Sequence, residues 1–317
     1  MLPERQFIER IRKLVAKGKR AGVVRGIGDD CAVLQVRPGS QLLVTTDLCL
    51  EGVHFRREWH PARSVGHRCL ARGLSDIAAM GGEPVACFLS LGAPSQLEKK
   101  WVDEFLRGLL RLARQFHVSL AGGDTSSAPK IMADIVLLGA VPAGEAVLRS
   151  GAQPGDCIYV TGHLGGSAAV LKSFNSKKTI SAGAARRHSY PVPRVNLGKW
   201  LRQKKISNAM IDLSDGLSVD LAHLCQESGV SAVVDESAIP IASGSTLDLA
   251  LHGGEDYELL FTAPARVKLL DKIAGIPITM IGKIGARSPG RLAVQIQDKT
   301  GRTKTLKPEG WQHFAKK

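Results

Sequence analysis

Apolar residues recur along this chain in helical and strand-like patterns that follow one another from end to end. The first segment places Phe7, Ile8, Ile11, Leu14 and Val15 at helical spacing between charged residues, which predicts an amphipathic helix. Further helices are expected at 62–80, 97–116, from Gly165, 216–228 and near 265–274. Short apolar runs predict strands at 31–36, 41–47, 84–91, 131–141, 157–162, 208–214, 231–236, 278–284 and 291–297.

The predicted strands arrive in pairs between helices instead of in strict alternation with them. This order indicates an α+β fold with mixed sheets in two halves, not a doubly wound nucleotide-binding fold. A length of 317 residues also fits about two domains. The turn-rich sequence LRSGAQPGD (148–156) is the predicted boundary, so we expect domains at residues 1–148 and 149–317.

The composition is that of an ordinary folded, soluble protein, with 44% hydrophobic and 23% charged residues. Its six cysteines form no CxxC pair and no zinc-like spacing with histidine, so we expect reduced thiols in the core. The charged N-terminal helix is unlike a signal peptide, and no apolar run reaches the roughly 20 residues of a membrane span. The expected location is the cytoplasm, without a membrane partner.

The formal charge of +14 is unevenly distributed, since residues 157–211 contain ten Lys and Arg residues and no Asp or Glu. Such a segment can be a solvated basic surface, or it can attract anionic small molecules or nucleic acid. Aromatic residues amount to only 5% and no standard nucleic-acid-binding motif is present, so nucleic acid is not an expected partner. Phosphorylated small molecules fit the charge pattern better, and the role of the segment stays open.

The acidic residues, in contrast, are concentrated in short motifs beside Gly, Ser or Thr. Each motif alone is typical of a turn, where Asp makes local hydrogen bonds. Several of them follow an apolar run, and a strand end is a place where a turn exposes groups that the strand holds in position. The six motifs are GIGDD (26–30), TTD (45–47), LSD (74–76), GGD (122–124), DLSDG (212–216) and GGED (253–256).

Brought together, these carboxylates would repel one another and raise each other's pKa values unless cations lay between them. Carboxylate and hydroxyl oxygens without His or Cys suit Mg²⁺, which commonly takes further ligands from substrate phosphates, so the motifs predict a metal–phosphate site. The absence of GxxxxGK[ST], HRD, DFG and GxSxG motifs disfavours P-loop enzymes, protein kinases and α/β-hydrolases. GHLGGS (162–167) is either a phosphate cradle at a helix N-terminus or a tight turn.

Seven segments, in order along nearly the whole chain, resemble the motifs of the thiamine-monophosphate kinase family. They are GIGDDCAVL, TTDLCLEGVHF, LSDIAAMGGEP, AGGDT, LRSGAQPGD, DLSDGL and GGEDYEL. GDD and GGDT occur across the superfamily that includes aminoimidazole ribonucleotide synthetase, selenophosphate synthetase and a hydrogenase-maturation dehydratase. GVHF, LSDIAAMG, GGEDYEL and the terminal GWQHF point to the kinase family itself.

The resemblance implies a two-domain aminoimidazole ribonucleotide synthetase-like fold, with an N-terminal mixed sheet that dimerises and a C-terminal α+β domain. It implies ATP-dependent phosphorylation of thiamine monophosphate to thiamine diphosphate by direct in-line transfer, assisted by several Mg²⁺ ions. The expected partners are therefore ATP, thiamine monophosphate and a second copy of the chain. The implied metal ligands, of which Asp30, Asp47, Asp124 and Asp212 are also implied to be catalytic, are Asp30, Thr45, Thr46, Asp47, Asp76, Asp124, Asp212 and Asp215.

The resemblance also implies a substrate side. An aromatic face and a carboxylate suit the thiazolium of thiamine, which is a permanent cation in an aromatic ring. No general base is expected, because the attacking phosphate is already ionised. Asp220, one turn beyond DLSDG, is expected on a helix face and not at the metal. The implied ATP-binding residues are Gly123, Asp124, Arg149 and Ser214, and the implied substrate-binding residues are His54, Glu255 and Trp311.

Two alternatives stay open from the sequence. Another ATP-dependent enzyme of the same superfamily would keep the ATP site and use a different small-molecule acceptor. A basic nucleic-acid-binding protein would show salt-dependent retention on DNA and no kinase activity.

Overall fold

The computed structural model describes residues 4–15, 22–25, 27, 32–176, 181–287 and 294–310. The chain divides into two compact units, residues 1–77 with 82–145 and residues 78–81 with 146–317. Each unit combines helices with β-sheet, and both parallel and antiparallel pairs occur, which confirms the predicted α+β fold with mixed sheets. Over the described ranges, no helix has the length and apolar character that crossing a membrane requires.

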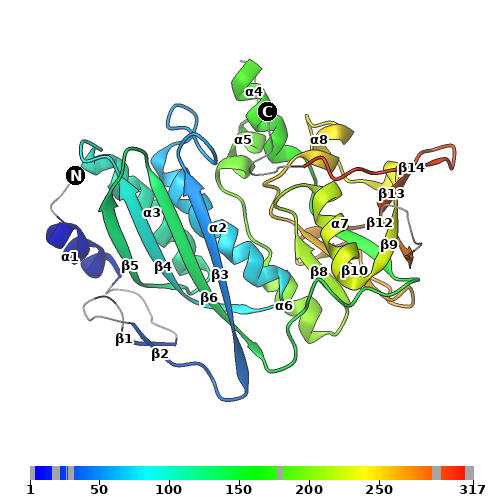
Figure 1. Ribbon diagram of the computed structural model, residues 1–317, viewed down its shortest axis with the longest axis horizontal. Coiled ribbons are helices and arrows are strands. Elements are labelled where there is room, and N and C mark those ends of the chain that lie inside the picture. The colour runs from blue at the N-terminus through cyan, green and yellow to red at the C-terminus, as the bar shows by residue number, and fades with distance from the viewer. Residues whose placement is uncertain are drawn as a thin grey trace. The chain divides into compact units, whose positions relative to one another are not determined.

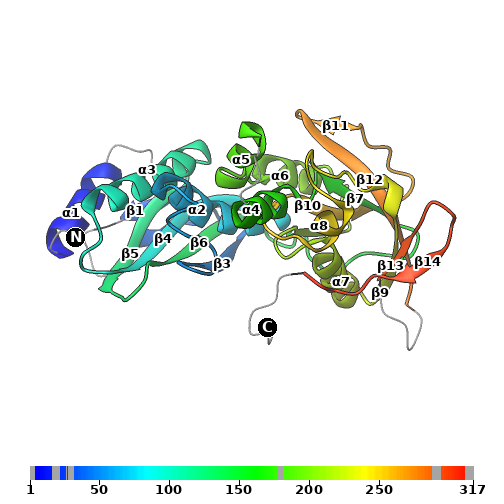
Figure 2. The same cartoon turned by 90° about the horizontal axis from the view of Figure 1, so that it is seen from above.

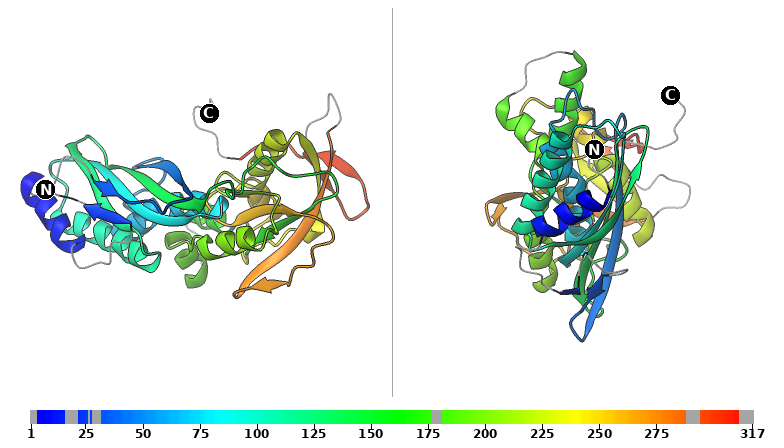
Figure 3. Two further views of the ribbon diagram at one scale, coloured as in Figure 1. Left: turned by 90° about the horizontal axis from the view of Figure 1, so that it is seen from below. Right: turned by 90° about the vertical axis from the view of Figure 1, so that its left-hand side faces the viewer.

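The first unit is built on a four-stranded sheet in the order β3-β6-β4-β5 (Figure 1). Strands β4 and β5 are parallel, and the other neighbours are antiparallel. Figure 3 shows the helices of this unit gathered on one side of its strands. The elements are α1 (Glu4–Val15), β1 (Val23–Arg25), β2 (Val33–Leu34), β3 (Ser40–Leu50), α2 (Ala62–Ala79), β4 (Glu83–Ala93), α3 (Lys99–Gln115), β5 (Ser119–Ser127) and β6 (Met132–Pro142).

Helices α2 and α3 cross in backbone contact, as the view in Figure 2 allows the reader to follow. A Cβ atom at Gly66 would lie 1.9 Å from the carbonyl oxygen of Phe105. A Cβ atom at Gly108 would lie 1.9 Å from the carbonyl oxygen of Arg63. Only glycine permits this approach. The crossing holds α2 in place against the sheet, and α2 carries Asp76, one of the predicted metal ligands.

The second unit contains an eight-stranded sheet, whose path is β14-β13-β9-β12-β7-β10-β8, with β11 paired to β12. The β9–β13 pair is parallel and the others are antiparallel. One face is covered by α7, whose Leu217, Leu221 and Leu224 join the main core of the unit. The elements are β7 (Cys157–Thr161), α4 (Gly166–Ser176), α5 (Ala182–Ser189), α6 (Val195–Gln203), β8 (Ala209–Asp212), α7 (Leu217–Ser228), β9 (Val230–Asp235), η1 (Glu236–Ala238), α8 (Leu247–His252), β10 (Leu259–Ala263), β11 (Lys272–Ile273), β12 (Ile276–Ala286), β13 (Val294–Gln297) and β14 (Thr303–Thr305).

The helix predicted near 265–274 is wrong. Ala274 and Gly275 both have positive φ, 50° and 80°, as a two-residue hairpin turn requires, and this turn pairs β11 with β12. Leu270, which a helix would have turned toward the core, is 75% exposed. Apolar spacing alone therefore misled the prediction, because the turn after it commits the segment to a hairpin.

The prediction for the cysteines is confirmed where the structure describes them. Cys49, Cys69, Cys87, Cys157 and Cys225 are free thiols with buried side chains. Cys31 lies outside the described residues.

Candidate functional site

Three of the predicted metal ligands meet where β3 faces α2 in the first unit. Successive residues of a strand point to opposite faces, so Thr45 and Asp47 share the helix-covered face of β3. Asp76 approaches the same place from α2, and the Thr45 hydroxyl donates a hydrogen bond to its Oδ2 atom. Thr46 occupies the alternate position, and its side chain is exposed on the opposite face. These motifs lie inside a strand and a helix, not at strand ends as the sequence suggested.

Asp47 has a basic partner that the sequence reasoning missed. The Nε atom of Arg72 lies 3.3 Å from Oδ1 of Asp47, and both side chains are largely shielded from solvent. Arg72 precedes Asp76 by four residues on α2, so the two side chains share one helix face. That spacing was the available signal. The cluster of oxygens in the first unit is thus already partly neutralised by an arginine.

Gly123 and Asp124 lie within β5, where the sequence indicated only a Gly-rich turn. Gly123 has φ of +149°, and a Cβ atom there would lie 1.9 Å from the carbonyl oxygen of Leu89 on β4. Glycine at this position thus lets the two parallel strands approach. The side chain of Asp124 is exposed, and its Oδ1 accepts a hydrogen bond from the Thr125 N–H at 2.8 Å.

A further acid, Asp134 on β6, lies in the same cross-strand row as Asp124. Ser90 on β4 pairs with Asp134 on one side and with Asp124 on the other, so the three side chains share a sheet face. Asp134 has no Gly, Ser or Thr beside it in the sequence, so it belongs to none of the acidic motifs and was not predicted as a site residue.

His54 lies in the loop that follows β3. Its Nδ1 atom accepts a hydrogen bond from the Leu50 N–H at 3.0 Å. This bond assigns the proton of the neutral imidazole to Nε2.

In the second unit, the DLSDG turn (residues 212–216) is joined to the GGEDYE loop (residues 253–258). The Glu255 N–H donates to the Ser214 carbonyl at 2.8 Å, and the Tyr257 N–H donates to the Leu213 carbonyl at 2.9 Å. A Cβ atom at Gly254 would lie 2.5 Å from the Ser214 carbonyl oxygen. Backbone hydrogen bonds therefore hold together the two loops that carry the predicted metal ligands Asp212 and Asp215, the predicted nucleotide contact Ser214 and the predicted substrate contact Glu255.

The GGEDYE loop holds strained backbone. Glu255 and Tyr257 have φ of 66° and 51°, values that side chains with a Cβ atom rarely adopt. Such strain costs of order 1–3 kcal/mol per residue and concentrates at functional sites. It directs Glu255 toward a pocket wall, which agrees with a binding role for this residue.

Asp220 lies in α7, as the sequence predicted, and the helix face that carries it is buried. It is only 2% exposed, and its Oδ2 atom accepts hydrogen bonds from the N–H groups of Ser214, Asp215 and Gly216, each at 3.1 Å. Burial raises the pKa of Asp220 well above its ordinary value, and the charges of Asp212 and Asp215 raise it further. The N-cap Gly216 has no side chain, so the start of α7 is capped from within the helix.

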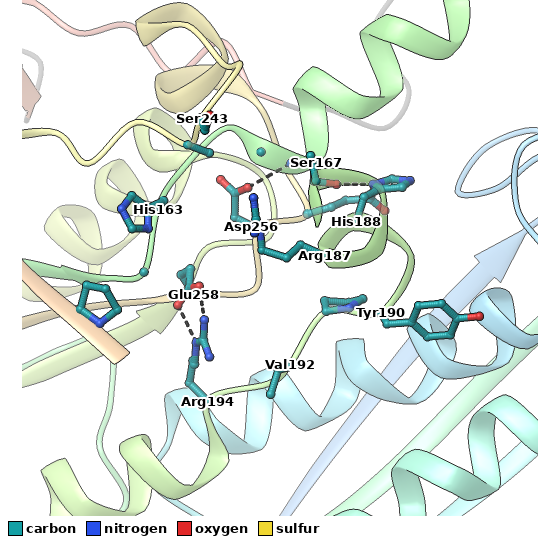
Figure 4. Close-up of a pocket in the computed structure, with 17 residues that line it drawn as sticks. His163, Ser167, Arg187, His188, Tyr190, Val192, Arg194, Ser243, Asp256 and Glu258 are labelled. Atoms are coloured by element: carbon teal, nitrogen blue, oxygen red, sulfur yellow. Dashed lines mark hydrogen bonds and ion pairs between the residues drawn. The ribbon is translucent and has the colours of Figure 1, made fainter. Parts of the chain in front are cut away.

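A pocket of about 380 Å³ lies beside the GGEDYE loop, at the end of β7 and the N-terminus of α4 (Figure 4). Glu258, 7% exposed, is held on its wall by Arg194, whose Nε donates at 2.7 Å and whose Nη2 also donates. Ser167 Oγ and His188 Nδ1 are hydrogen-bonded at 2.8 Å on another wall. Figure 4 shows Arg187 extending across the pocket in the direction of Asp256. Asp256, Glu258 and Ser167 belong to motifs that the sequence analysis quoted, whereas Arg187, His188 and Arg194 do not.

Asp256 decides between the two interpretations of GHLGGS. Its carboxylate accepts hydrogen bonds from the Gly165 N–H at 2.6 Å and the Ser167 N–H at 3.4 Å. Burial raises the pKa of Asp256 to about 7, although these N–H groups act in the opposite direction. The donors that a phosphate cradle would need are thus engaged by an internal acid, which favours the tight-turn interpretation.

The remaining predicted residues lie at the edge of the described structure or beyond it. Arg149 is exposed, and its carbonyl accepts a hydrogen bond from Ser228 Oγ at 2.7 Å. Asp30 and Trp311 lie outside the described residues. Gly310, the last described residue, is so close to the DLSDG turn that a Cβ atom would lie 2.2 Å from the Asp215 carbonyl oxygen. The chain thus enters its C-terminal segment beside the turn.

The donor sets fit Mg²⁺ better than a softer metal, since each consists of carboxylate and hydroxyl oxygens. Burial is the main cause of the raised pKa of Asp220, and the charges of Asp212 and Asp215 add to it; a bound cation would offset this second contribution. Among the residues that the structure describes, no three His, Cys, Asp or Glu side chains form a ready-made metal cage. Phosphate oxygens, water or undescribed residues such as Asp30 would have to complete the coordination.

Family models define the class of protein to which this architecture belongs. The AIR synthase related protein N-terminal domain matches residues 28–141, and the AIR synthase related protein C-terminal domain matches residues 153–295. The thiamine-monophosphate kinase of Salmonella typhimurium is 38% identical, and the match covers 98% of this chain and 96% of the relative. The chain therefore belongs to the thiamine-monophosphate kinase family of AIR synthase related proteins.

Solved structures agree with this assignment. The crystal structure of thiamine-monophosphate kinase from Stenotrophomonas maltophilia has a TM-score of 0.82 at 37% identity, covering 93% of this chain and 96% of the other. A second structure, AaThiL complexed with AMPPCP and TMP, has a TM-score of 0.77 at 30% identity, covering 98% and 97% of the two chains.

Proposed function

We propose that this protein transfers the γ-phosphoryl group of ATP to thiamine monophosphate and so forms thiamine diphosphate. The observation that carries the proposal is the match along nearly the whole chain to a family member whose complex holds AMPPCP and TMP. The oxygen-rich groups on β3, α2 and the DLSDG turn supply the chemistry that such a transfer needs, namely positioning and neutralisation of phosphate charge. The attacking oxygen is an ionised phosphate oxygen, so no proton has to be removed.

We propose Mg²⁺ as the metal. When bound, it would neutralise the triphosphate and the charge that develops during transfer. The proposed ligands are Asp30, Thr45, Thr46, Asp47, Asp76, Asp124, Asp212 and Asp215, and the acids among them that are proposed to be catalytic are Asp30, Asp47, Asp124 and Asp212. Thr46 and Asp124 have side chains on the sheet face opposite Thr45 and Asp47, since Asp124 lies in one cross-strand row with Ser90, Asp134 and Leu48.

For each of the two substrates, the proposed contacts come from both proposed domains, residues 1–148 and 149–317. Gly123, Asp124, Arg149 and Ser214 are proposed to contact ATP. His54, Glu255 and Trp311 are proposed to contact thiamine monophosphate. Two observations support this side: the Leu50 N–H holds the His54 ring through its Nδ1 atom, and Glu255 has a positive φ and lines a pocket.

A homodimer is proposed through the uncovered face of the first sheet. Leu42, Val44 and Leu48 alternate along β3 on the face opposite Asp47, and they are 45%, 59% and 41% exposed. Met132 on β6 pairs with Leu50, so its 41% exposed side chain lies on the same face. A second copy of the chain would cover this apolar surface. Sedimentation equilibrium with Val44→Lys tests it: we expect a monomer at concentrations where the unsubstituted chain is dimeric.

The decisive test of the activity is an assay of purified protein with Mg²⁺, ATP and a panel of acceptors. Thiamine diphosphate formed from thiamine monophosphate supports the proposal. If ATP is consumed only with a different acceptor, the protein has another activity of the superfamily. Salt-dependent DNA binding without any phosphoryl transfer would instead favour the nucleic-acid alternative.

A further inference from the structure

The start of α7 is filled by a carboxylate of the helix itself. A single oxygen of Asp220 accepts hydrogen bonds from three consecutive N–H groups, those of Ser214, Asp215 and Gly216, each at 3.1 Å. Gly216 is the N-cap, has φ of 113° and has no side chain that could cap the helix. Asp220 thus takes the role that an N-cap Ser, Thr, Asp or Asn commonly has.

This contact determines which groups the DLSDG turn presents to a ligand. A helix start with unengaged N–H groups attracts anions, because those donors and the helix dipole act together. Here three donors are turned inward to Asp220, and the carbonyls of Leu213 and Ser214 accept from Tyr257 and Glu255. The N–H groups of the turn are therefore engaged within the chain, and the side chains of Ser214 and Asp215 are half-buried.

We propose that Asp220 is a positioning residue that makes the DLSDG turn a cation-binding surface and not an anion-binding one. The inference rests on the proposed function in so far as it takes Asp212 and Asp215 as metal ligands. Asp220 acts through the backbone of the turn: it fixes the orientation of residues 214–216, and with them the carboxylate of Asp215. It touches neither substrate nor metal in this scheme.

The first test compares Asp220→Ala with Asp220→Asn. The asparagine keeps an oxygen acceptor for the turn, whereas the alanine removes it. We expect Asp220→Ala to raise the Mg²⁺ concentration for half-maximal activity about 10- to 100-fold, as loss of a ligand-orienting partner does. We expect kcat to fall with it, and the KM for thiamine monophosphate to stay near its original value. Asp220→Asn should need nearly the same Mg²⁺ concentration for half-maximal activity as the unsubstituted chain.

The control is Asp156→Ala. Asp156 is also a buried carboxylate of the second unit, 4% exposed, and accepts hydrogen bonds from the Gln153 N–H and the Asn208 amide. Its loss should lower the melting temperature and leave the Mg²⁺ response unchanged. If Asp220→Ala behaves in the same way, with an unaltered Mg²⁺ response, Asp220 is only a structural cap and the proposal is wrong.

A second test needs no turnover. In Asp220→Ala, three N–H donors at the start of α7 lose their internal partner, so inorganic phosphate without Mg²⁺ should raise the melting temperature of this variant and not of the unsubstituted chain. Equal shifts in both proteins would contradict the proposal. If Asp220→Ala does not fold, Asp220→Ser, with a shorter acceptor, takes its place in both tests. An unsubstituted chain that binds Mg²⁺ and ATP but does not phosphorylate thiamine monophosphate would refute the proposed function, and the phosphate-binding test would still apply.

Discussion

Arg194 and Glu258 form the ion pair whose removal should be most costly to the second unit. Glu258 is 7% exposed, and its oxygens accept from the Nε and Nη2 atoms of Arg194 and from the hydroxyl of Thr161. Burial lowers the pKa of Arg194, but its hydrogen bond and charge interaction with Glu258 outweigh that effect and raise the pKa. In Arg194→Met the carboxylate would remain buried without its charged partner.

The expected loss is about 3–5 kcal/mol in the free energy of unfolding, the range for breaking one side of a buried pair. For a unit of this size, 1 kcal/mol shifts the melting temperature by roughly 2–4 °C, so the transition should fall by roughly 6–20 °C. An exposed ion pair would give about 0–1 kcal/mol. The two cases therefore differ by more than the error of a calorimetric measurement.

The assay is differential scanning calorimetry of the full chain with Arg194→Met, Glu258→Gln and the double variant. The glutamine keeps an acceptor for Thr161, and the double variant removes both charges together. We expect the double variant to be clearly more stable than Arg194→Met alone, because no buried charge is left unpaired. Additive losses in the two single variants, or a loss below about 1 kcal/mol for Arg194→Met, would refute the reasoning.

Further substitutions test other parts of the structure. Gly108→Ala should strongly destabilise the first unit in thermal unfolding, since its Cβ would lie 1.9 Å from the Arg63 carbonyl oxygen; an unchanged melting temperature would mean that the helices do not cross there. Asp212→Asn should abolish transfer and leave the metal-free melting temperature unchanged or higher, because like-charge repulsion falls; a large loss of stability would contradict the metal role. The folded pKa of Asp256, about 7, lies above its ordinary value of 3.8, so the folded state holds the extra proton and its stability falls as pH rises between these values. Asp256→Asn should remove that decline in a pH series of melting temperatures, and a parallel pH dependence in both proteins would rule out this titration.

The periodic parts of the fold were accessible from the sequence, and the parts set by distant contacts were not. The helices at 62–79 and 99–115 follow from apolar spacing over many turns. The strand at Ser119–Ser127 contains GGDTSS, which has low strand propensity by itself, and it exists because β4 pairs with it in parallel. The false helix near 265–274 has the converse cause, since a short hairpin turn overrode a helical pattern.

In the site, too, some residues were predictable from the sequence and others depend on contacts between distant segments. Thr45, Asp47 and Asp76 were predicted residues, and the structure brings them together between β3 and α2. Arg72, which pairs with Asp47, was not predicted: its spacing from Asp76 indicates a shared helix face but does not identify a partner on a strand. The basic segment 157–211 is partly explained in the same way: Arg194 binds Glu258, and Arg202, 7% exposed, donates to the Gly81 carbonyl at 2.8 Å. Some of its positive charge is thus used for packing and not for ligands.

Both Gly-rich helix starts of the second unit are occupied by internal acids. Asp220 fills the start of α7, and Asp256 fills the start of α4. The two cases differ in how far the acid lies along the chain: four residues separate Gly216 from Asp220, whereas 91 separate Gly165 from Asp256. The short spacing can be read from a sequence, and the long one depends on the fold. A Gly-rich loop before a helix therefore indicates a phosphate site only where no acid of the same chain reaches its N–H groups, and that condition fails at both loops of this unit.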